Sequence, residues 1–228
     1  MSNNALFPEP VPAASQFAIM PFLSAIEGLL DDRTNVPGLR VTMHRVMSRE
    51  GDGFLQQACA YLPIKSPNWR SKVGRIFPVT EGIIGKAYKT SAVWRTPHFA
   101  TEQAFKAELA AAKAEVGDDP SKVGFSWLAI PFLGPSNEVV LILFAECEEF
   151  NFFADDARVQ QIVGMCRGYC RLFDELQSDP YPNLRNFPLE RGTPVIAKET
   201  VYRFQEQLSI RPPKFNSIYS FNYEASVA

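Results

Sequence analysis

Two apolar segments joined by a short turn constrain the fold of this chain more than any other feature. Residues 124–133 read GFSWLAIPFL and residues 138–147 read EVVLILFAEC, with GPSN between them. Glycine, proline, serine and asparagine are typical of turns, and the flanking segments have the length and composition of strands. The pair therefore predicts an antiparallel β-hairpin.

A second hairpin is predicted earlier in the chain. Its segments are a strand over residues 39–48, a turn over 49–53 that contains Asp52-Gly53, a partner strand over 54–63 and a short third strand over 74–79. In the first strand Leu39, Val41 and Met43 alternate with polar residues such as His44. Because successive side chains point to opposite faces, we expect His44 to face away from helices that cover the three apolar residues.

Helices are expected near residues 21–31, 99–116 and 155–177. Pro21 suits a first helical turn, the middle segment is rich in alanine, glutamate and lysine, and Asp155 opens the last segment favourably for the helix dipole. Together with the hairpins, these helices indicate an α+β fold with a central antiparallel sheet and helices on its faces.

The last predicted helix carries two adjacent apolar stripes. The first stripe consists of Val159, Ile162, Val163, Cys166, Cys170 and Phe173, and the second of Met165, Tyr169, Leu172 and Leu176. One stripe is expected to pack on the sheet and the other on a second helix. That second helix is either residues 21–31 of the same chain or the same helix of a second subunit, in which case the second stripe is a homodimer interface.

Residues 77–97 (FPVTEGIIGKAYKTSAVWRTP) read as a strand, a glycine-punctuated turn, a short helix and a second short strand. Gly82 and Gly85 bracket two isoleucines, and the segment approaches its end with Trp94-Arg95. Such a segment could be catalytic, could line a small-molecule pocket, or could be only a crossover.

Composition excludes some classes of partner. The 228 residues have a formal net charge of −2 and a sequence pI near 5.8, which argues against a broad surface for nucleic acid or an anionic membrane. The longest apolar run, residues 139–145, is far shorter than the roughly 20 residues of a membrane-spanning helix. The N-terminus lacks the pattern of a secretory signal, so we expect a cytoplasmic protein whose four cysteines are reduced and mostly buried.

The two ends of the chain differ from its middle. Residues 1–16 are proline-containing and are predicted to form a loose arm, and residues 177–228 are predicted to be a proline-rich extension of a domain that spans 17–176. Within the extension, only residues 197–209 have a helical composition.

Three motifs make residues 17–176 similar to a known family. TEGIIGKAYKTSAVWRTP has a Gly-apolar-apolar-Gly helix before a short strand, AIPFLGPSNEVVLILFAEC has an apolar-Pro-apolar strand with an apolar return strand, and FNFFADDARVQQIVGMCRGYC has a Phe-acidic-acidic entry into a terminal helix. On these motifs the chain resembles a GAF domain, a small-ligand sensory module related to PAS domains.

The resemblance implies an antiparallel sheet of five to six strands, with the N- and C-terminal helices on one face. It also implies a ligand cavity on the other face, covered by the glycine-bracketed segment, and dimerisation through the terminal helices. The residues that we expect to line this cavity are His44, Arg75, Trp94, Arg95, His98, Phe99, Phe125 and Trp127.

Several of these residues have a simpler interpretation. Trp94 could stack on a ligand ring while Arg95 pairs with an acidic group, or the Trp could pack on the core beside a solvated Arg. Phe125 and Trp127 alternate on one strand and could form either an aromatic cavity floor or part of the core.

The chain departs from members of the family with a known ligand. The dispersed pattern of cyclic-nucleotide-binding members is not found, no cysteine is placed for a covalent bilin, and no histidine is convincing as a haem ligand. No phosphate-binding loop, hydrolase motif or metal-ligand spacing is present either, so we expect no cofactor, no metal and no enzymatic activity.

The sequence thus predicts a sensory domain that binds a small metabolite or nucleotide-type ligand, which is aromatic or anionic. Because no output domain is recognisable, such a domain would signal to an effector protein in trans through its terminal helices. The alternative is a scaffold of the same fold that binds no ligand and uses its C-terminal extension for dimerisation or partner binding.

Overall fold

The structure of the protein is a computed structural model. It describes residues 11, 13–31, 35–49, 52–63, 73–80, 82–115, 126–176, 193–194 and 205–216. The helices are α1 (Ala13–Asp31), α2 (Gly82–Thr90), α3 (Glu102–Glu115), the 3-10 helix η2 (Phe152–Ala154) and α4 (Asp156–Leu176). The strands are β1 (Arg40–Arg49), β2 (Asp52–Gln57), β3 (Ile76–Pro78), β4 (Val93–Arg95), β5 (Ser126–Leu133), β6 (Val139–Cys147), β7 (Thr193–Pro194) and β8 (Glu206–Leu208).

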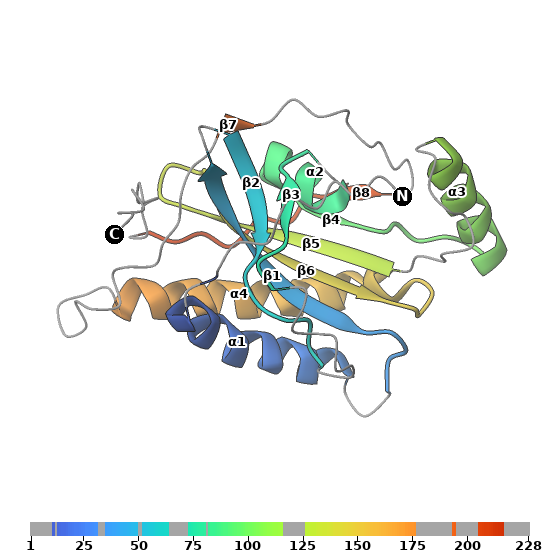
Figure 1. Cartoon of the computed structure of the whole chain (residues 1–228). Helices are drawn as coiled ribbons and strands as arrows, with labels where there is room; N and C mark the ends of the chain where they lie inside the picture. The colour runs from blue at the N-terminus through green and yellow to red at the C-terminus, as the bar shows by residue number, and fades with distance from the viewer. Residues whose placement is uncertain are drawn as a thin grey trace.

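The strands form one sheet in the order β3-β2-β1-β6-β5-β4-β8, and neighbours along this path are antiparallel (Figure 1). The predicted α+β class is therefore confirmed, as are the hairpins β1–β2 and β5–β6. The expected count of five to six strands was too low, because β8 joins the sheet beside β4 and the short β7 pairs in parallel with β2. Both additional strands come from the C-terminal region.

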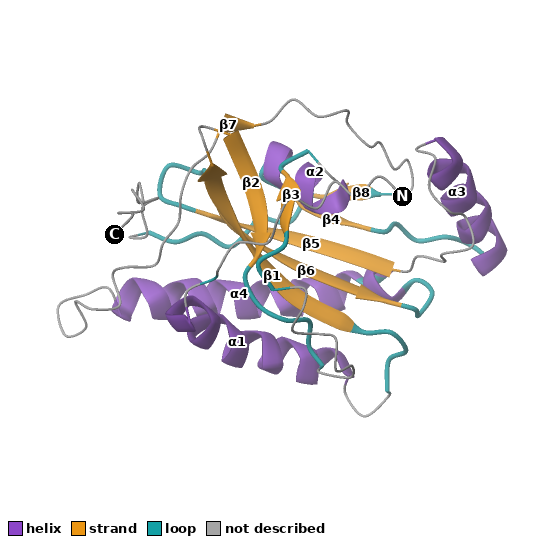
Figure 2. Cartoon of the chain, viewed as in Figure 1, coloured by secondary structure: helices purple, strands orange, loops and turns teal. Residues whose placement is uncertain are grey.

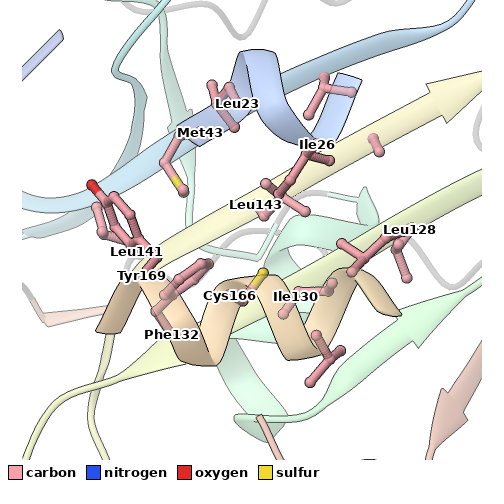
Figure 3. Packing of buried hydrophobic residues seen from close by; sticks show 14 of the residues in the cluster. Leu23, Ile26, Met43, Leu128, Ile130, Phe132, Leu141, Leu143, Cys166 and Tyr169 are labelled. Carbon is pink, nitrogen blue, oxygen red and sulfur yellow. The ribbon is translucent and has the colours of Figure 1, made fainter. Parts of the chain in front are cut away.

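Helices α1 and α4 lie side by side on one face of the sheet (Figure 2). The sheet contributes the apolar side of each central strand to this core, and Val41, Met43 and Leu143 are fully buried there. Figure 3 shows Leu23 and Ile26 of α1 and Cys166 of α4 directed into the same interior. The expectation that the first and last helices share one face is thus met by their packing.

The second stripe of α4 packs mainly within the chain. Tyr169 is buried, its ring stacks on Phe22 of α1 at 4.2 Å, and its hydroxyl donates to the Ala18 carbonyl. Of the two partners that the sequence allows for this stripe, Tyr169 therefore contacts the first helix of the same chain, and its place in a dimer interface stays a prediction. Met165 is half-buried against the core, whereas Leu172 is exposed, and the side chain of Leu176 lies outside the described residues.

Helix α2 lies on the opposite face of the sheet (Figure 1), where Ile83, Ile84 and Ala87 form a second core. Glycine is needed at two positions of this helix, for a different physical reason at each. Gly82 has a φ of 61°, in the left-handed region that glycine adopts at no steric cost because it has no Cβ. Gly85 lies against the main chain of the preceding turn, because a Cβ there would be 2.4 Å from the carbonyl carbon of Thr80.

Two predicted boundaries are corrected. Helix α1 begins at Ala13, with Pro21 in its interior, because Ile19 is buried in the core and extends the helix upstream of the proline. The turn expected over residues 49–53 is shorter than predicted, because Asp52 and Gly53 already pair with Arg49 and Ser48. The connection falls at residues 50–51, which lie outside the described residues.

Residues 205–216, which we call the C-terminal strap, add to the sheet and to the main core. The helix predicted over 197–209 is wrong for its last part, because residues 206–208 form β8 against the edge of β4. Further on, the Phe215 ring is fully buried beside Phe132 and Phe173. The strap therefore holds together β4, β5 and α4, although its sequence lies beyond the expected domain boundary.

Candidate functional site

The sheet face opposite α1 and α4 carries a group of polar side chains on β1 and β2. His44 of β1 pairs with Gln57 of β2, so both side chains point to this face, as the alternation of residues 39–44 predicts for His44. Thr42 lies next to them and donates its hydroxyl to the Cys59 carbonyl at 2.9 Å. All three side chains are buried.

Two atoms of this group have no hydrogen-bond partner among the described residues. They are Nδ1 of His44 and Oε1 of Gln57, and both are buried. The Gln57 amide nitrogen, by contrast, donates to the Cys59 carbonyl at 3.0 Å. Buried polar atoms in native proteins are nearly always hydrogen-bonded, and an unpaired one costs about 1–3 kcal/mol. Two such atoms on neighbouring strands therefore call for an explanation.

Aromatic rings flank His44 on both sides. The centroids of Phe77 on β3 and Phe144 on β6 lie 5.7 Å and 6.1 Å from that of the imidazole, and both rings meet it edge to face. Arg75 extends over the Phe77 ring at 5.0 Å. Both phenylalanines are only half-buried, so the polar pair lies beneath aromatic rings at the surface of this face.

The environment of His44 lowers its pKa from the usual 6.5 to about 3. Burial is the main cause, because it disfavours the imidazolium ion, and the positive charge of Arg75 acts in the same direction. His44 is therefore neutral near pH 7, with one ring nitrogen as a donor and the other as an acceptor. It can hydrogen-bond a neutral polar group, but it does not supply a positive charge.

A second polar group adjoins the first on the same face. The Glu146 carboxylate pairs with Arg40 at 2.7 Å and accepts a hydrogen bond from the Trp127 indole at 3.2 Å. The Arg40 guanidinium also lies 5.3 Å from the centre of the Tyr61 ring. Burial raises the pKa of Tyr61 to about 12, with a contribution from Glu146, so its hydroxyl stays protonated.

Five of the expected site residues, His44, Arg75, Trp94, Phe99 and Trp127, lie on or next to this face. His44 and Arg75 both contact Phe77, and Trp127 is hydrogen-bonded to Glu146. Phe99 connects to them through Phe105, whose ring centroid lies 5.3 Å from that of Phe99 and 6.4 Å from that of Trp127.

Trp94 and Arg95 do not act together, because adjacent residues of β4 point to opposite faces. Trp94 packs beside α2, where its indole donates to the Thr90 hydroxyl at 2.8 Å and Lys86 lies over its ring at 5.0 Å. The half-buried Trp lies on the same face as His44, since it pairs with Ala129, which pairs with Phe144, and Trp94 packs on the same apolar cluster as Phe77 and Phe144.

Arg95 is buried and fully engaged within the chain. Its guanidinium pairs with Glu206 at 2.6 Å and Asp156 at 2.7 Å, and it donates to the carbonyls of Phe153 and Ala154. It thus ties β4 to the strap and to the start of α4, and the expected ionic contact with a ligand does not fit this geometry. His98 is exposed in a loop, and Phe125 lies outside the described residues.

Sequence reasoning missed Gln57, Phe77, Phe144 and Glu146. A single strand shows which of its own residues share a face, but it does not show the register of its neighbours. The pairing of His44 with both Gln57 and Ile142 is what brings these side chains together. The polar residue at 57, within an otherwise buried strand, was the available signal.

Two cavities lie away from this group. One of about 410 Å³ is lined by Val79, Thr80, Tyr88, Lys89, Ser91, Ser136, Asn137, Glu138 and Val139. It lies between the C-terminal end of α2 and the β5–β6 turn, and none of the expected site residues lines it. The other, of about 390 Å³, lies between α4 and the strap.

Metal-ligand types and cysteine thiols are the remaining reactive groups of the described chain. Within the described ranges, no group of three or more histidine, cysteine, aspartate or glutamate side chains is placed to hold a metal ion. All four cysteines are buried and free, as expected. Burial raises the pKa of Cys59 to about 11 and that of Cys147 to about 12, so the reactive thiolate is disfavoured near neutral pH.

Neither a search against protein-family models nor a search of curated proteins finds a match for this chain. Among the described residues, the helices lack the combination of length and apolar character that crossing a bilayer requires.

Proposed function

We propose that this protein is a ligand-binding sensory domain of the GAF type, and that its site is the group around His44 and Gln57. One observation carries the proposal: two buried polar atoms on paired strands, His44 Nδ1 and Gln57 Oε1, have no partner among the described residues. They lie on the sheet face opposite the terminal helices. A ligand that hydrogen-bonds both atoms would remove the cost of leaving them unpaired.

The surroundings of the two atoms define the chemistry of the ligand. Phe77 and Phe144 suit a flat ring, and neutral His44 with the Gln57 carbonyl suits a ring that has both hydrogen-bond donors and acceptors. Arg75, over the ring of Phe77, can pair with an acidic substituent. A nucleobase-like or aromatic anionic metabolite satisfies these requirements, and it enters by displacing the two half-buried rings.

Binding on this face has a direct route to the terminal helices. On β1 the His44 side chain points toward the proposed ligand, and the Met43 side chain points into the core that α1 and α4 share. Because protein interiors are closely packed, displacement of one of these side chains shifts the packing on the other face. The movement of the helices is the output of the sensor and is detected by a partner protein or by a second copy of the chain.

The proposal is tested by a thermal-shift screen of the purified protein against nucleosides, nucleotides, cyclic nucleotides and aromatic carboxylates. A ligand at roughly 100 times its Kd stabilises the native state by about 3 kcal/mol, which raises Tm by roughly 5–10 °C for a domain of this size. The affinity of each compound that raises Tm is then measured by calorimetry with the wild type, His44→Leu and Gln57→Leu.

Both variants are expected to lose binding while remaining folded, because leucine keeps the volume of the side chain but not its hydrogen-bonding atom. His98→Gln is the matched control, since it replaces the exposed histidine of the described chain and should bind as the wild type does. Equal affinity in His44→Leu and in the control would contradict the proposed site, and a screen without any stabilising compound would count against the sensor itself.

A second candidate function, a dimerisation scaffold, has its own support. The exposed large apolar side chains of the described residues all lie on the terminal helices: Phe17 at 77% exposure, Leu29 at 38% and Leu172 at 51%. A second copy that docks on these helices would cover them. Sedimentation velocity of the wild type and Leu172→Glu decides this: a dimer that the glutamate dissociates supports the scaffold, and a wild-type monomer at micromolar concentration opposes it.

A further inference from the structure

The cavity of about 390 Å³ lies far from His44, between the outer side of α4 and the C-terminal strap. Its lining residues are Gln160, Val163, Arg167, Ser209, Ile210 and Arg211. Figure 1 shows the strap as the red segment that runs from β8 toward the C-terminal end of α4. The cavity exists only while the strap is docked, because three of its lining residues belong to α4 and three to the strap.

The polar groups of this cavity are suited to an anion. Two guanidinium groups, one side-chain amide and one hydroxyl line it, and no carboxylate does. Arginine presents its donors as a planar fork that matches the oxygens of a phosphate group. Val163 and Ile210 are the apolar residues of the lining.

The two arginines leave their charge unneutralised. Arg167 donates to the main-chain carbonyl of Arg211 at 2.8 Å, which is a bond to a neutral group. Throughout the part of the chain that the structure describes, neither arginine forms an ion pair, whereas Arg95, Arg40 and Arg158 each do. Two like charges that line one cavity repel each other, whereas an anion between them is attracted to both.

We propose that this cavity is a binding site for a phosphate-bearing small molecule, and that the bound anion fastens the strap to α4. The phosphate oxygens accept from Arg167 on the helix and from Arg211 on the strap, with Gln160 and Ser209 as further donors. Binding therefore stabilises the docked strap, and through β8 it stabilises the edge of the sheet at β4. This site is separate from the proposed ligand site at His44 and does not depend on it.

Pyrophosphate, inorganic phosphate and malonate are the probes, each titrated by calorimetry at matched ionic strength into the wild type and its variants. We expect pyrophosphate to bind, and Arg211→Gln or Arg167→Gln to weaken it about tenfold or more, as loss of a charge-assisted hydrogen bond implies. Arg211→Gln keeps the bond that Arg167 donates, since its acceptor is main chain, so a loss of binding there reflects the missing guanidinium. Arg211→Lys retains the charge without the planar fork of donors. Its affinity for pyrophosphate should lie between those of the wild type and Arg211→Gln.

Arg171→Gln is the matched control, because it removes the same charge from the same helix, four residues beyond Arg167 and outside the cavity lining. Its affinity for pyrophosphate should stay within about twofold of the wild type, since an exposed charge outside the lining makes no hydrogen bond to the anion and acts only through screened attraction. Hydrogen exchange provides the second readout: pyrophosphate should slow exchange in residues 205–216 of the wild type and not of Arg211→Gln.

Three results would overturn the proposal. They are no measurable binding of pyrophosphate or phosphate by the wild type, an equal loss of binding in Arg171→Gln and Arg211→Gln, and malonate binding as tightly as pyrophosphate. The second would show attraction to general positive charge, and the third would show a carboxylate site. Unchanged exchange in the strap with pyrophosphate bound would refute the fastening role.

Discussion

The buried imidazole of His44 makes the stability of the protein depend on pH in a way that can be calculated. Its pKa is about 3 in the folded chain and 6.5 in the unfolded chain. Below the pKa of the unfolded chain, His44 binds a proton in the unfolded state but stays neutral in the folded state. The free energy of unfolding therefore falls as the pH is lowered. The contribution of neutral His44 is thus fully present above the unfolded pKa and is lost progressively between the two values.

The size of the effect follows from the two pKa values. Relative to about pH 7, this one residue lowers the free energy of unfolding by about 1 kcal/mol at about pH 5.5 and by about 3 kcal/mol at about pH 4.5. In His44→Leu the titrating group is absent and this part of the pH dependence disappears. The variant should also be about 1–3 kcal/mol more stable than the ligand-free wild type near neutral pH, because it removes an unpaired buried nitrogen.

Urea unfolding at the three pH values, followed by tryptophan fluorescence and by circular dichroism, measures both effects. His98→Gln is the control, and its unfolding free energy should follow that of the wild type at each pH. If His44→Leu loses as much stability as the wild type between about pH 7 and about pH 4.5, the imidazole is not held neutral by burial and the reasoning fails. A variant less stable than the wild type near neutral pH would show that Nδ1 is already satisfied.

Four further substitutions test the packing that surrounds the site. Gly85→Ala should cost about 1–3 kcal/mol of unfolding free energy, measured in urea, because its Cβ would meet the Thr80 main chain at 2.4 Å; an unaffected midpoint would contradict that contact. Arg95→Met should cost about 2–3 kcal/mol and speed hydrogen exchange in residues 206–208, whereas protection equal to the wild type would show that the strap is held by other contacts. Phe215→Ala should cost about 3–5 kcal/mol, and a loss below about 1 kcal/mol would mean that the ring is not part of the core. Tyr169→Phe should cost about 1 kcal/mol and leave the sedimentation coefficient unchanged, since the hydroxyl bonds to Ala18 of the same chain; a changed oligomeric state would place Tyr169 at an interface.

The arrangement of the main elements could be predicted wherever local chemistry and tertiary packing agree. The GPSN turn is one example, since Asn137 adopts the positive φ that asparagine tolerates and the flanking apolar segments pair as expected. The short helix between Gly82 and Thr90 is another, because its glycines satisfy a local conformation and a close contact. In both cases nothing distant competes with the local preference.

Prediction failed where tertiary contacts override local preference. Residues 206–208 have helix-forming neighbours, yet they form a strand, because the edge of β4 offers unpaired backbone groups and Arg95 offers a charge to Glu206. Similarly, Pro21 would end or begin an isolated helix, but buried Ile19 and Leu23 on either side keep α1 continuous through it.

The candidate site was predicted in part, for a geometric reason. Alternation along one strand placed His44 on the correct face, and the same rule shows that Trp94 and Arg95 could never face one cavity together. Gln57 and Phe144 could not be predicted to adjoin His44, since cross-strand register depends on three strands at once. The unpaired atoms that carry the functional proposal are visible only once that register is known.

The most direct measurement of the central claim is the ¹⁵N resonance of the His44 imidazole, recorded with and without a compound that raises Tm. We expect a neutral His44 ring whose Nδ1 makes no hydrogen bond in the free protein and gains one when the compound binds. The Nδ1 resonance of His44 should therefore move, while that of His98 should not. An Nδ1 that is already hydrogen-bonded in the free protein, or that stays unchanged when the compound is bound, would contradict the claim that His44 and Gln57 form the ligand site.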